Sequence, residues 1–262
     1  MKLNLVLIAL LLATRLSHAD TTVIYKLPDY NNSENFLTYY IKNNLLRFKE
    51  EGKNKTNVFD PAKQEFTSVD RDTGNISRIN EDIVNQQAEK LNKERLDKLK
   101  AVEAEFSQKL QSMDANKKQI AEVLMNKLKY PEFYGDQAYL SSQKTTTRKH
   151  INGIECQVYS VNLHDKLIRQ ICMASMDKLG ISKDDYTTLR AFYKFNYNIQ
   201  SRMLLAAGKA SYTFIDYEEH NIEGIPLEVT AFTDHGSTQE QLLHKISNDP
   251  LNSALFDISS AK

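Results

Sequence analysis

One long stretch of this sequence contains no residue that breaks a helix. Residues 81–129 include neither glycine nor proline, and Ala, Leu, Glu, Gln and Lys dominate them. Because these residues have high helix propensities, the stretch is predicted to be helical. Tyr130-Pro131 ends it, since proline cannot continue the hydrogen bonds of a helix backbone.

The apolar residues of this stretch recur at three- and four-residue steps and form one stripe: Leu99, Val102, Phe106, Leu110, Met113, Ile120 and Leu124. A stripe flanked by mixed charges is typical of a helix that packs along a core or on a partner helix. Asp114 and Asn116 favour helix caps over helix interiors, which predicts a break at residues 113–116. We therefore expect a helical hairpin or a bent helix rather than one long free coiled coil.

A second helix is predicted to begin after Ser182. The serine side chain can cap the first free amides, and Asp184 and Asp185 suit the positive end of a helix. Large apolar residues follow on one face: Leu189, Phe192, Phe195, Ile199 and Met203. This stripe either packs in a core under a sheet or lines a cleft for an apolar ligand.

The segment VDRDTGNI, residues 69–76, admits two interpretations. A calcium loop needs oxygen ligands at positions 1, 3 and 5, glycine at position 6 and glutamate at position 12. Counted from Asp70, Gly74 falls at the fifth position and Asn75 at the sixth, so the pattern is broken. A tight turn between two strands is favoured instead. The upstream segment FDPAKQEF has the same build, which predicts a meander of short strands at residues 57–59, 65–69 and 75–79.

The two cysteines lie in apolar, β-branched segments, residues 154–161 and 167–174, on either side of a polar stretch. An antiparallel hairpin centred on His164 places Cys156 directly opposite Cys172. In an oxidising compartment two facing thiols are expected to form a disulfide. Closing a loop of about 15 residues in this way stabilises a fold by roughly 3 kcal/mol. A redox pair or a metal site is less favoured, because C-x-x-C spacing and further nearby zinc ligands are missing.

The chain begins in the manner of an exported protein. Lys2 precedes an apolar run at residues 3–12, and Ser17-His18-Ala19 offers small residues at the two positions that a signal peptidase reads. We expect cleavage after Ala19. The run is shorter than the ~20 residues of a membrane-spanning helix, and Arg15 interrupts its end. The expected product is a single domain of residues 20–262, in a bacterial periplasm or outside the cell.

Charge and motif content exclude several function classes. The 34 basic and 34 acidic residues become 32 and 34 once Lys2 and Arg15 are removed, a balance that does not attract nucleic acid or an acidic membrane surface. The histidines show no H-x-x-H or H-E-x-x-H spacing: His150, His164, His220, His235 and His244. Residues 217–220, Tyr-Glu-Glu-His, offer metal ligands, but a charged hairpin tip is the favoured interpretation. No catalytic residue, cofactor or metal is predicted.

Strands are predicted to return near the C-terminus, at residues 210–217, 227–233 and 241–246, with a turn at residues 222–226. The order of motifs along the chain then resembles a family of bacterial envelope proteins of unknown function, whose fold is like that of the periplasmic lipoprotein carriers (LolA-like). The matching motifs are Arg47, Phe59-Asp60 before residues 66–70, the Gln- and Met-bearing helical segment, Gly153-Ile154-Glu155-Cys156 with Cys172-Met173-Ala174, Gly224-Ile225-Pro226 and Leu255-Phe256-Asp257. Ile258-Ser259-Ser260 departs from the family, which commonly has a proline and an aromatic residue there.

The resemblance implies an α+β fold in which a curved antiparallel sheet, a half-barrel, holds helices on its concave face. It also implies an apolar cleft. We therefore expect a non-enzymatic binding or carrier protein for a lipid or another hydrophobic ligand, with the cleft lined by Leu189, Phe192, Phe195, Ile199 and Met203. The alternative is a structural or adaptor protein of the cell envelope that holds a partner with residues 81–129. For an enzyme, the third class, the sequence gives no positive evidence.

Overall fold

The computed structural model describes residues 20–259 apart from residues 31–32, 51–52, 135–138 and 209–214. This part of the chain is an α+β fold with one eleven-stranded antiparallel sheet. The elements, in chain order, are β1 (Thr21–Tyr30), β2 (Ser33–Lys42), β3 (Leu45–Glu50), β4 (Lys55–Asp60), β5 (Glu65–Asp70), β6 (Ile76–Asn80), α2 (Glu81–Gln111), α3 (Ala115–Lys129), α4 (Pro131–Tyr134), β7 (Leu140–Ile151), β8 (Ile154–Leu163), β9 (Lys166–Ala174), α5 (Met176–Leu179), α6 (Lys183–Ala206), β10 (Ile225–Thr233), β11 (Gly236–Ser247) and the 3-10 helix η2 (Ser253–Phe256). The expected cleavage site after Ala19 borders residues 1–19, which lie outside the described residues.

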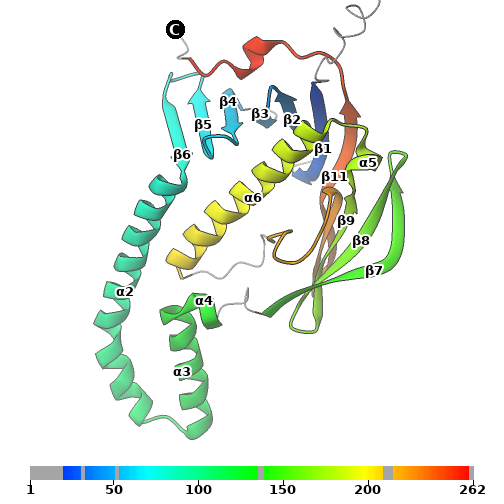
Figure 1. The fold of residues 1–262 in the computed structure, drawn as a ribbon. Coiled ribbons are helices and arrows are strands. Elements are labelled where there is room, and N and C mark those ends of the chain that lie inside the picture. Colours follow the sequence, from blue (N-terminus) through cyan, green and yellow to red (C-terminus); the bar gives the residue numbers. More distant parts are fainter. Residues whose placement is uncertain (1–19, 31–32, 51–52, 135–138, 209–214, 260–262) are drawn as a thin grey trace, which may run out of the picture.

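The sheet consists of two meanders joined at its middle. Its strand order is β6-β5-β4-β3-β2-β1-β11-β10-β9-β8-β7. β1 pairs with β2 on one side and with β11 on the other, so the first and last of the described strands join the two meanders. The two edge strands, β6 and β7, are consecutive in the sequence, and the helices α2, α3 and α4 connect them (Figure 1).

The predicted meander at residues 57–79 is confirmed as β4, β5 and β6. At the β5–β6 turn, the Asp70 carboxylate accepts hydrogen bonds from the amides of Asp72 (3.1 Å) and Thr73 (2.9 Å). Gly74 follows with φ 72°, a conformation that glycine adopts without steric cost. The acidic side chain therefore stabilises its own hairpin turn.

The predicted disulfide between Cys156 and Cys172 is confirmed, with a Cα–Cα distance of 5.4 Å. The predicted register was wrong, because the residue opposite Cys172 is Val158. The turn is centred between His164 and Asp165, and a register shift follows at Val161/Asn162. The two cysteines are therefore diagonal neighbours on the same face of the sheet, a distance that a disulfide spans.

Near the C-terminus the strands predicted at residues 227–233 and 241–246 are confirmed within β10 and β11. The strand predicted at residues 210–217 is wrong where it can be judged, because residues 215–217 lead into a turn. Its other residues, 210–214, lie outside the described part. The Asp216 carboxylate accepts hydrogen bonds from the amides of Glu218 (2.8 Å) and Glu219 (3.2 Å), which favours a turn over an extended strand.

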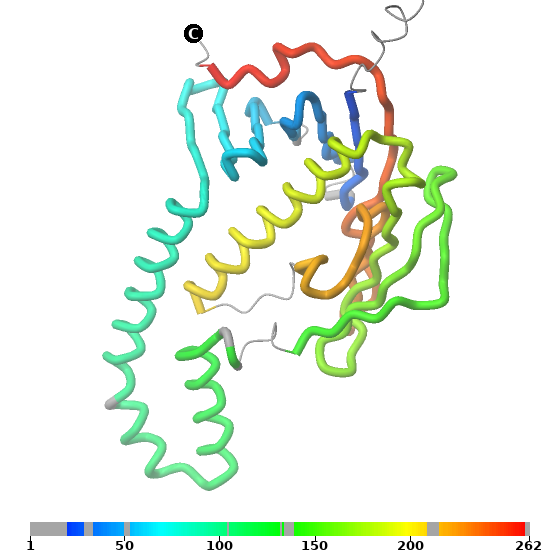
Figure 2. The backbone as a smooth tube through the Cα atoms, in the orientation of Figure 1, coloured from blue at the N-terminus to red at the C-terminus, as the bar shows by residue number. Residues whose placement is uncertain are grey.

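The predicted helical hairpin is confirmed as α2 and α3, which extend away from the sheet (Figures 1 and 2). The break falls where it was predicted, and the Asp114 carboxylate caps α3 by accepting from the amide of Lys117 at 2.9 Å. The apolar stripe divides between two environments. Leu99, Phe106, Leu110 and Met113 are half-buried, whereas Val102, Ile120 and Leu124 are exposed. No helix among the described residues is long and apolar enough to cross a membrane.

Candidate functional site

The helix α6 lies against the sheet (Figure 1) and positions the largest aromatic cluster among the described residues. Its predicted start is confirmed, because the Ser182 hydroxyl accepts a hydrogen bond from the amide of Asp185 at 3.0 Å. The buried Asp185 carboxylate in turn accepts a hydrogen bond from the Thr21 hydroxyl at 2.7 Å, which ties α6 to β1. One turn further on, Leu189 is completely buried in the core.

Phe192 is the centre of the aromatic cluster. Its ring centroid lies 5.6 Å from Tyr39, 5.8 Å from Phe48 and 5.6 Å from Phe59, rings that come from β2, β3 and β4. Phe195, one turn later, lies 4.8 Å from Phe59. Edge-to-face and tilted contacts at such distances stabilise aromatic pairs beyond the burial of their surface. The cluster therefore fixes α6 on the N-terminal meander.

A hollow of about 420 Å³ opens beside this cluster. Side chains from β1, β2, β3, β5, β6 and α6 line it: Leu27, Leu37, Tyr39, Phe48, Phe66, Ile79, Phe192, Phe195, Asn196 and Ile199. Asn196 and Tyr39 are the lining residues with a polar side-chain group, and no lining side chain is charged. Burial raises the pKa of Tyr39 well above its usual value, so its phenol is neutral at physiological pH.

The structure separates the five residues predicted to line a cleft. Phe192, Phe195 and Ile199 border the hollow together. Leu189 is in the core, and Met203 is not among the lining residues. The sheet residues that complete the lining, Leu27, Leu37, Phe48, Phe66 and Ile79, were not singled out from the sequence. A period-two alternation of apolar residues could have indicated two of them: Val23, Tyr25 and Leu27 share one face of β1, and Leu37, Tyr39 and Ile41 share one face of β2.

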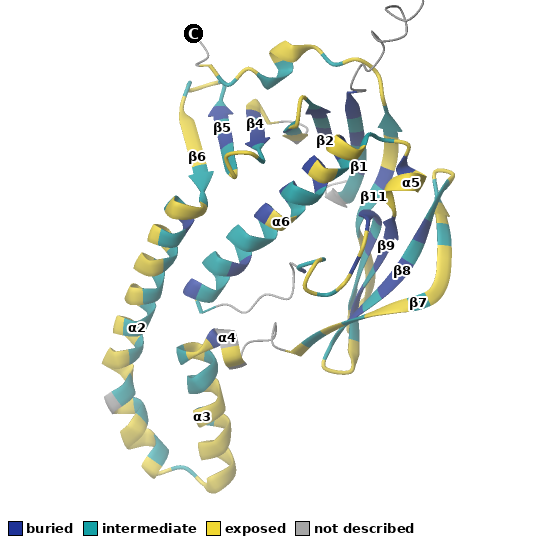
Figure 3. Cartoon of the chain, viewed as in Figure 1, coloured by how far each residue is buried: buried dark blue, intermediate teal, exposed yellow. Residues whose placement is uncertain are grey.

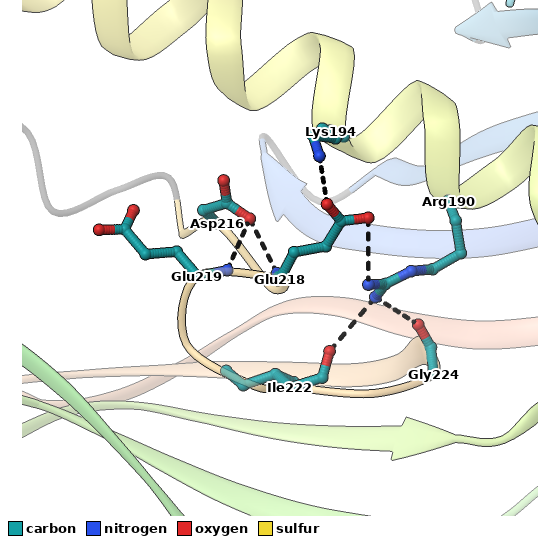
Figure 4. A network of polar contacts seen from close by, with 7 residues as sticks. All are labelled: Arg190, Lys194, Asp216, Glu218, Glu219, Ile222 and Gly224. Carbon is teal, nitrogen blue, oxygen red and sulfur yellow. Dashed lines mark hydrogen bonds and ion pairs between the residues drawn. The ribbon is translucent and has the colours of Figure 1, made fainter.

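On another side of α6, a polar network holds the loop that precedes β10 (Figure 4). The Glu218 carboxylate pairs with Lys194, and with Arg190 at 3.9 Å. Arg190 also donates hydrogen bonds to the carbonyl oxygens of Ile222 (3.3 Å) and Gly224 (3.1 Å). The loop is therefore attached to the helix through the Arg190 guanidinium.

Residues 217–220, whose side chains offer metal ligands, belong to this loop. Glu218 is engaged with Lys194 and Arg190 (Figure 4), and desolvation raises the pKa of the Tyr217 phenol to about 12. Among the described side chains, no group of three His, Cys, Asp or Glu lies close enough to hold a metal ion. The favoured interpretation was a charged hairpin tip: these residues do form a charged turn, but it lies in the loop before β10 and does not join two strands of a hairpin.

Two arginines connect the hairpin to α6. Arg202 of α6 donates to the Asn85 side chain (2.6 Å) and pairs with Glu81 (2.7 Å) at the start of α2. Arg95 of α2 donates to the carbonyl oxygens of Ala206 (3.1 Å) and Lys129 (3.4 Å), the last residues of α6 and α3. A cation at two helix C-termini is favourable, because both ends carry partial negative charge. The helix α6, which forms one wall of the hollow, is thus held to the α2–α3 hairpin by these contacts.

Comparison of the chain with protein-family models and with curated proteins gives no match.

Proposed function

We propose that this protein binds an apolar ligand in the hollow beside α6 and acts as a non-enzymatic binding or carrier protein. In this proposal the sheet forms a half-barrel, α6 occupies its concave face, and the ligand lies between them. The observation that carries the proposal is a hollow of about 420 Å³ with an uncharged, mostly aromatic and aliphatic lining. Binding sites for small molecules commonly have volumes of about 300–1,000 Å³ and such a lining.

The lining supports a ligand whose inserted part is uncharged. A carboxylate or ammonium group in the hollow would lose its hydration without gaining an oppositely charged partner, which is unfavourable. Asn196 and Tyr39 offer hydrogen bonds to one or two polar atoms only. We propose a lipid or a similarly hydrophobic compound as the ligand, with any charged group outside.

The proposed location is the periplasm or the space outside the cell. The disulfide between Cys156 and Cys172 supports it, because such bonds persist in oxidising compartments. The signal peptide expected from residues 1–19 and its cleavage after Ala19 belong to the same proposal.

A titration with an environment-sensitive apolar dye, followed by displacement with fatty acids, tests the binding site. We expect saturable binding to the wild type, and loss of that binding in Ile199→Asp, which places a charge in the lining. Met203→Asp is the matched control, because it puts the same charge one turn further along α6, outside the lining. Circular dichroism verifies that both variants are folded. Equal binding by both variants, or no binding by the wild type, would count against the proposal.

The exposed apolar side chains of α3 favour a second candidate function, that of an adaptor which uses the hairpin to hold an envelope partner. The triple variant Ile120→Gln/Leu124→Gln/Leu128→Gln, which removes exposed apolar surface from α3, separates the two functions. It retains Arg95 and its contacts with α6. Dye binding is expected to persist in this variant if the hollow is the ligand site, whereas an adaptor loses its partner.

A further inference from the structure

The helix α3 presents an apolar stripe that the rest of the described chain leaves uncovered. Ile120, Val123, Leu124 and Leu128 follow at steps of three and four residues and are between 44% and 62% exposed. No residue of α3 is classed as buried, and Figure 3 shows how much of the helix is exposed. Such a stripe is unusual on a soluble surface, because contiguous apolar patches generally mark an interaction site.

The charges of α3 indicate what covers this stripe. The helix carries four lysines, Lys117, Lys118, Lys127 and Lys129, and a single acid, Glu122. Lys117 stands three residues before Ile120, and Lys127 stands three residues after Leu124, so both lysines lie on the same side of the helix as the stripe, one near each end of it. Lys117 pairs with the capping Asp114 and Lys129 with Glu103, contacts on a partly exposed surface that contribute little stability. The balanced charge of the whole chain thus conceals a local basic excess.

We propose that α3 docks the protein on an anionic lipid surface, with its apolar stripe inserted among the acyl chains and its lysines at the lipid phosphates. A helix of 15 residues is about 22 Å long and does not span a hydrocarbon core of about 30 Å, so it lies along the interface. Aliphatic residues on one side with flanking lysines are the pattern of interfacial helices. Long lysine side chains keep their ammonium groups at the polar layer while their stems cover apolar surface.

Two further observations favour a lipid surface. Tyr130 and Phe133, just after α3, are 48% and 70% exposed, and aromatic residues favour the boundary between lipid and water. The hairpin extends away from the sheet, and α3 packs chiefly against α2 and α4, so the sheet does not block a flat surface (Figure 2). A second copy of the chain is a poorer occupant, because pairing two α3 stripes brings lysines close to lysines.

Co-sedimentation with vesicles tests the proposal, using the chain from Asp20 onward, which contains every described element. Vesicles of phosphatidylcholine with phosphatidylglycerol are compared with vesicles of phosphatidylcholine alone. We expect stronger binding to the anionic vesicles. The double variant Ile120→Gln/Leu124→Gln, which removes apolar surface and no charge, is expected to lower that binding at least about tenfold. Lys117→Gln/Lys127→Gln is expected to lower it by a similar factor at low salt only, since salt screens the charges.

A fluorescent reporter locates the inserted face. The chain contains no tryptophan, so one introduced residue reports its own surroundings. The emission of Leu124→Trp is expected to shift to shorter wavelengths with anionic vesicles, whereas Glu122→Trp, on the opposite side of the helix, shifts little. Equal vesicle binding by the wild type and the Ile120→Gln/Leu124→Gln variant, or no binding by either, would overturn the proposal. A shift of Leu124→Trp that depends on protein concentration without vesicles would also overturn it and assign the stripe to a second copy.

Discussion

The ring of Phe195 lies 4.8 Å from the ring of Phe59, centroid to centroid, and Phe195 also borders the hollow beside α6. Phe59 comes from β4 and is completely buried. The pair therefore marks the boundary between packed core and open lining. A residue on that boundary contributes to stability with one part of its surface and to ligand contact with another.

The two phenylalanines are expected to differ in their contribution to stability. Phe59→Ala should lower the free energy of unfolding by about 4 kcal/mol, because it removes a ring packed on all sides. Phe195→Ala should cost less, about 2–3 kcal/mol, because part of its surface already faces the hollow. Urea denaturation of the two variants measures the difference. Equal costs would show that Phe195 is ordinary core.

Replacing both cysteines tests the disulfide. Cys156→Ser with Cys172→Ser is expected to lower the free energy of unfolding by about 3 kcal/mol. The reason is that the bond joins residues 16 positions apart and restricts the loop between them in the unfolded chain. In the wild type, a thiol reagent added after denaturation without reductant should label no cysteine. Two labelled thiols per chain would contradict the bond.

Asp185 is expected to make stability depend on pH. Burial raises the pKa of this carboxyl above its ordinary value of 3.8, so the folded protein holds the proton more tightly than the unfolded chain does. The stability that the protonated Asp185 contributes to the folded state is therefore fully present below pH 3.8 and is lost as the pH rises through the pKa of Asp185 in the folded protein. Asp185→Asn keeps an acceptor for Thr21 without titrating. Urea denaturation should show that the free energy of unfolding of Asp185→Asn rises relative to that of the wild type as the pH increases from 3 to 7. A fall relative to the wild type would refute the raised pKa of Asp185.

Gly224 and Gly236 form a matched pair for a backbone test. Both have positive φ, 110° and 128°, where a side chain is strained. A Cβ on Gly224 would also lie 2.5 Å from the carbonyl oxygen of Ala174, whereas one on Gly236 meets nothing within 4 Å. Gly224→Ala is therefore expected to cost more than Gly236→Ala, which carries only the conformational strain of about 1–3 kcal/mol. Thermal melting compares the two variants. An equal fall in melting temperature would contradict the close approach of the β9 backbone to Gly224.

Local signals predicted the three long helices, α2, α3 and α6, and the hairpins of β4, β5 and β6. The Ser182 and Asp114 caps, the stop at Tyr130-Pro131 and the turn at Asp70 act within a few residues, so the sequence reveals them. The register of the disulfide hairpin was missed for two reasons: the turn is centred between His164 and Asp165 instead of on His164, and the shift at Val161/Asn162 leaves no local mark. The edge strand β7 was missed because its polar sequence, LSSQKTTTRKHI, lacks apolar alternation. Such charged edges protect a sheet against unwanted pairing.

The site was predictable only on its helical side. Phe192, Phe195 and Ile199 follow a helical period and were identified together. The opposite wall combines residues such as Leu27, Phe48 and Phe66, which are distant in the sequence. Their proximity depends on the pairing of all six strands from β1 to β6, of which the sequence predicted only the β4–β5–β6 part. In β2, Phe36 and Tyr40 lie on the face opposite Leu37 and Tyr39 and are also aromatic. The alternation of apolar and polar residues expected of a strand is therefore hard to recognise in its sequence.

Photo-crosslinking with a diazirine-bearing fatty acid, followed by peptide mapping, tests the ligand site most directly. We predict that the label falls on peptides of α6 containing Phe195 or Ile199 and on strand peptides containing Leu37, Phe48 or Phe66. An excess of unlabelled fatty acid should suppress these adducts, and Ile199→Asp should abolish them while Met203→Asp retains them. Adducts confined to α3, or adducts that Ile199→Asp leaves unchanged, would contradict a ligand site in the hollow.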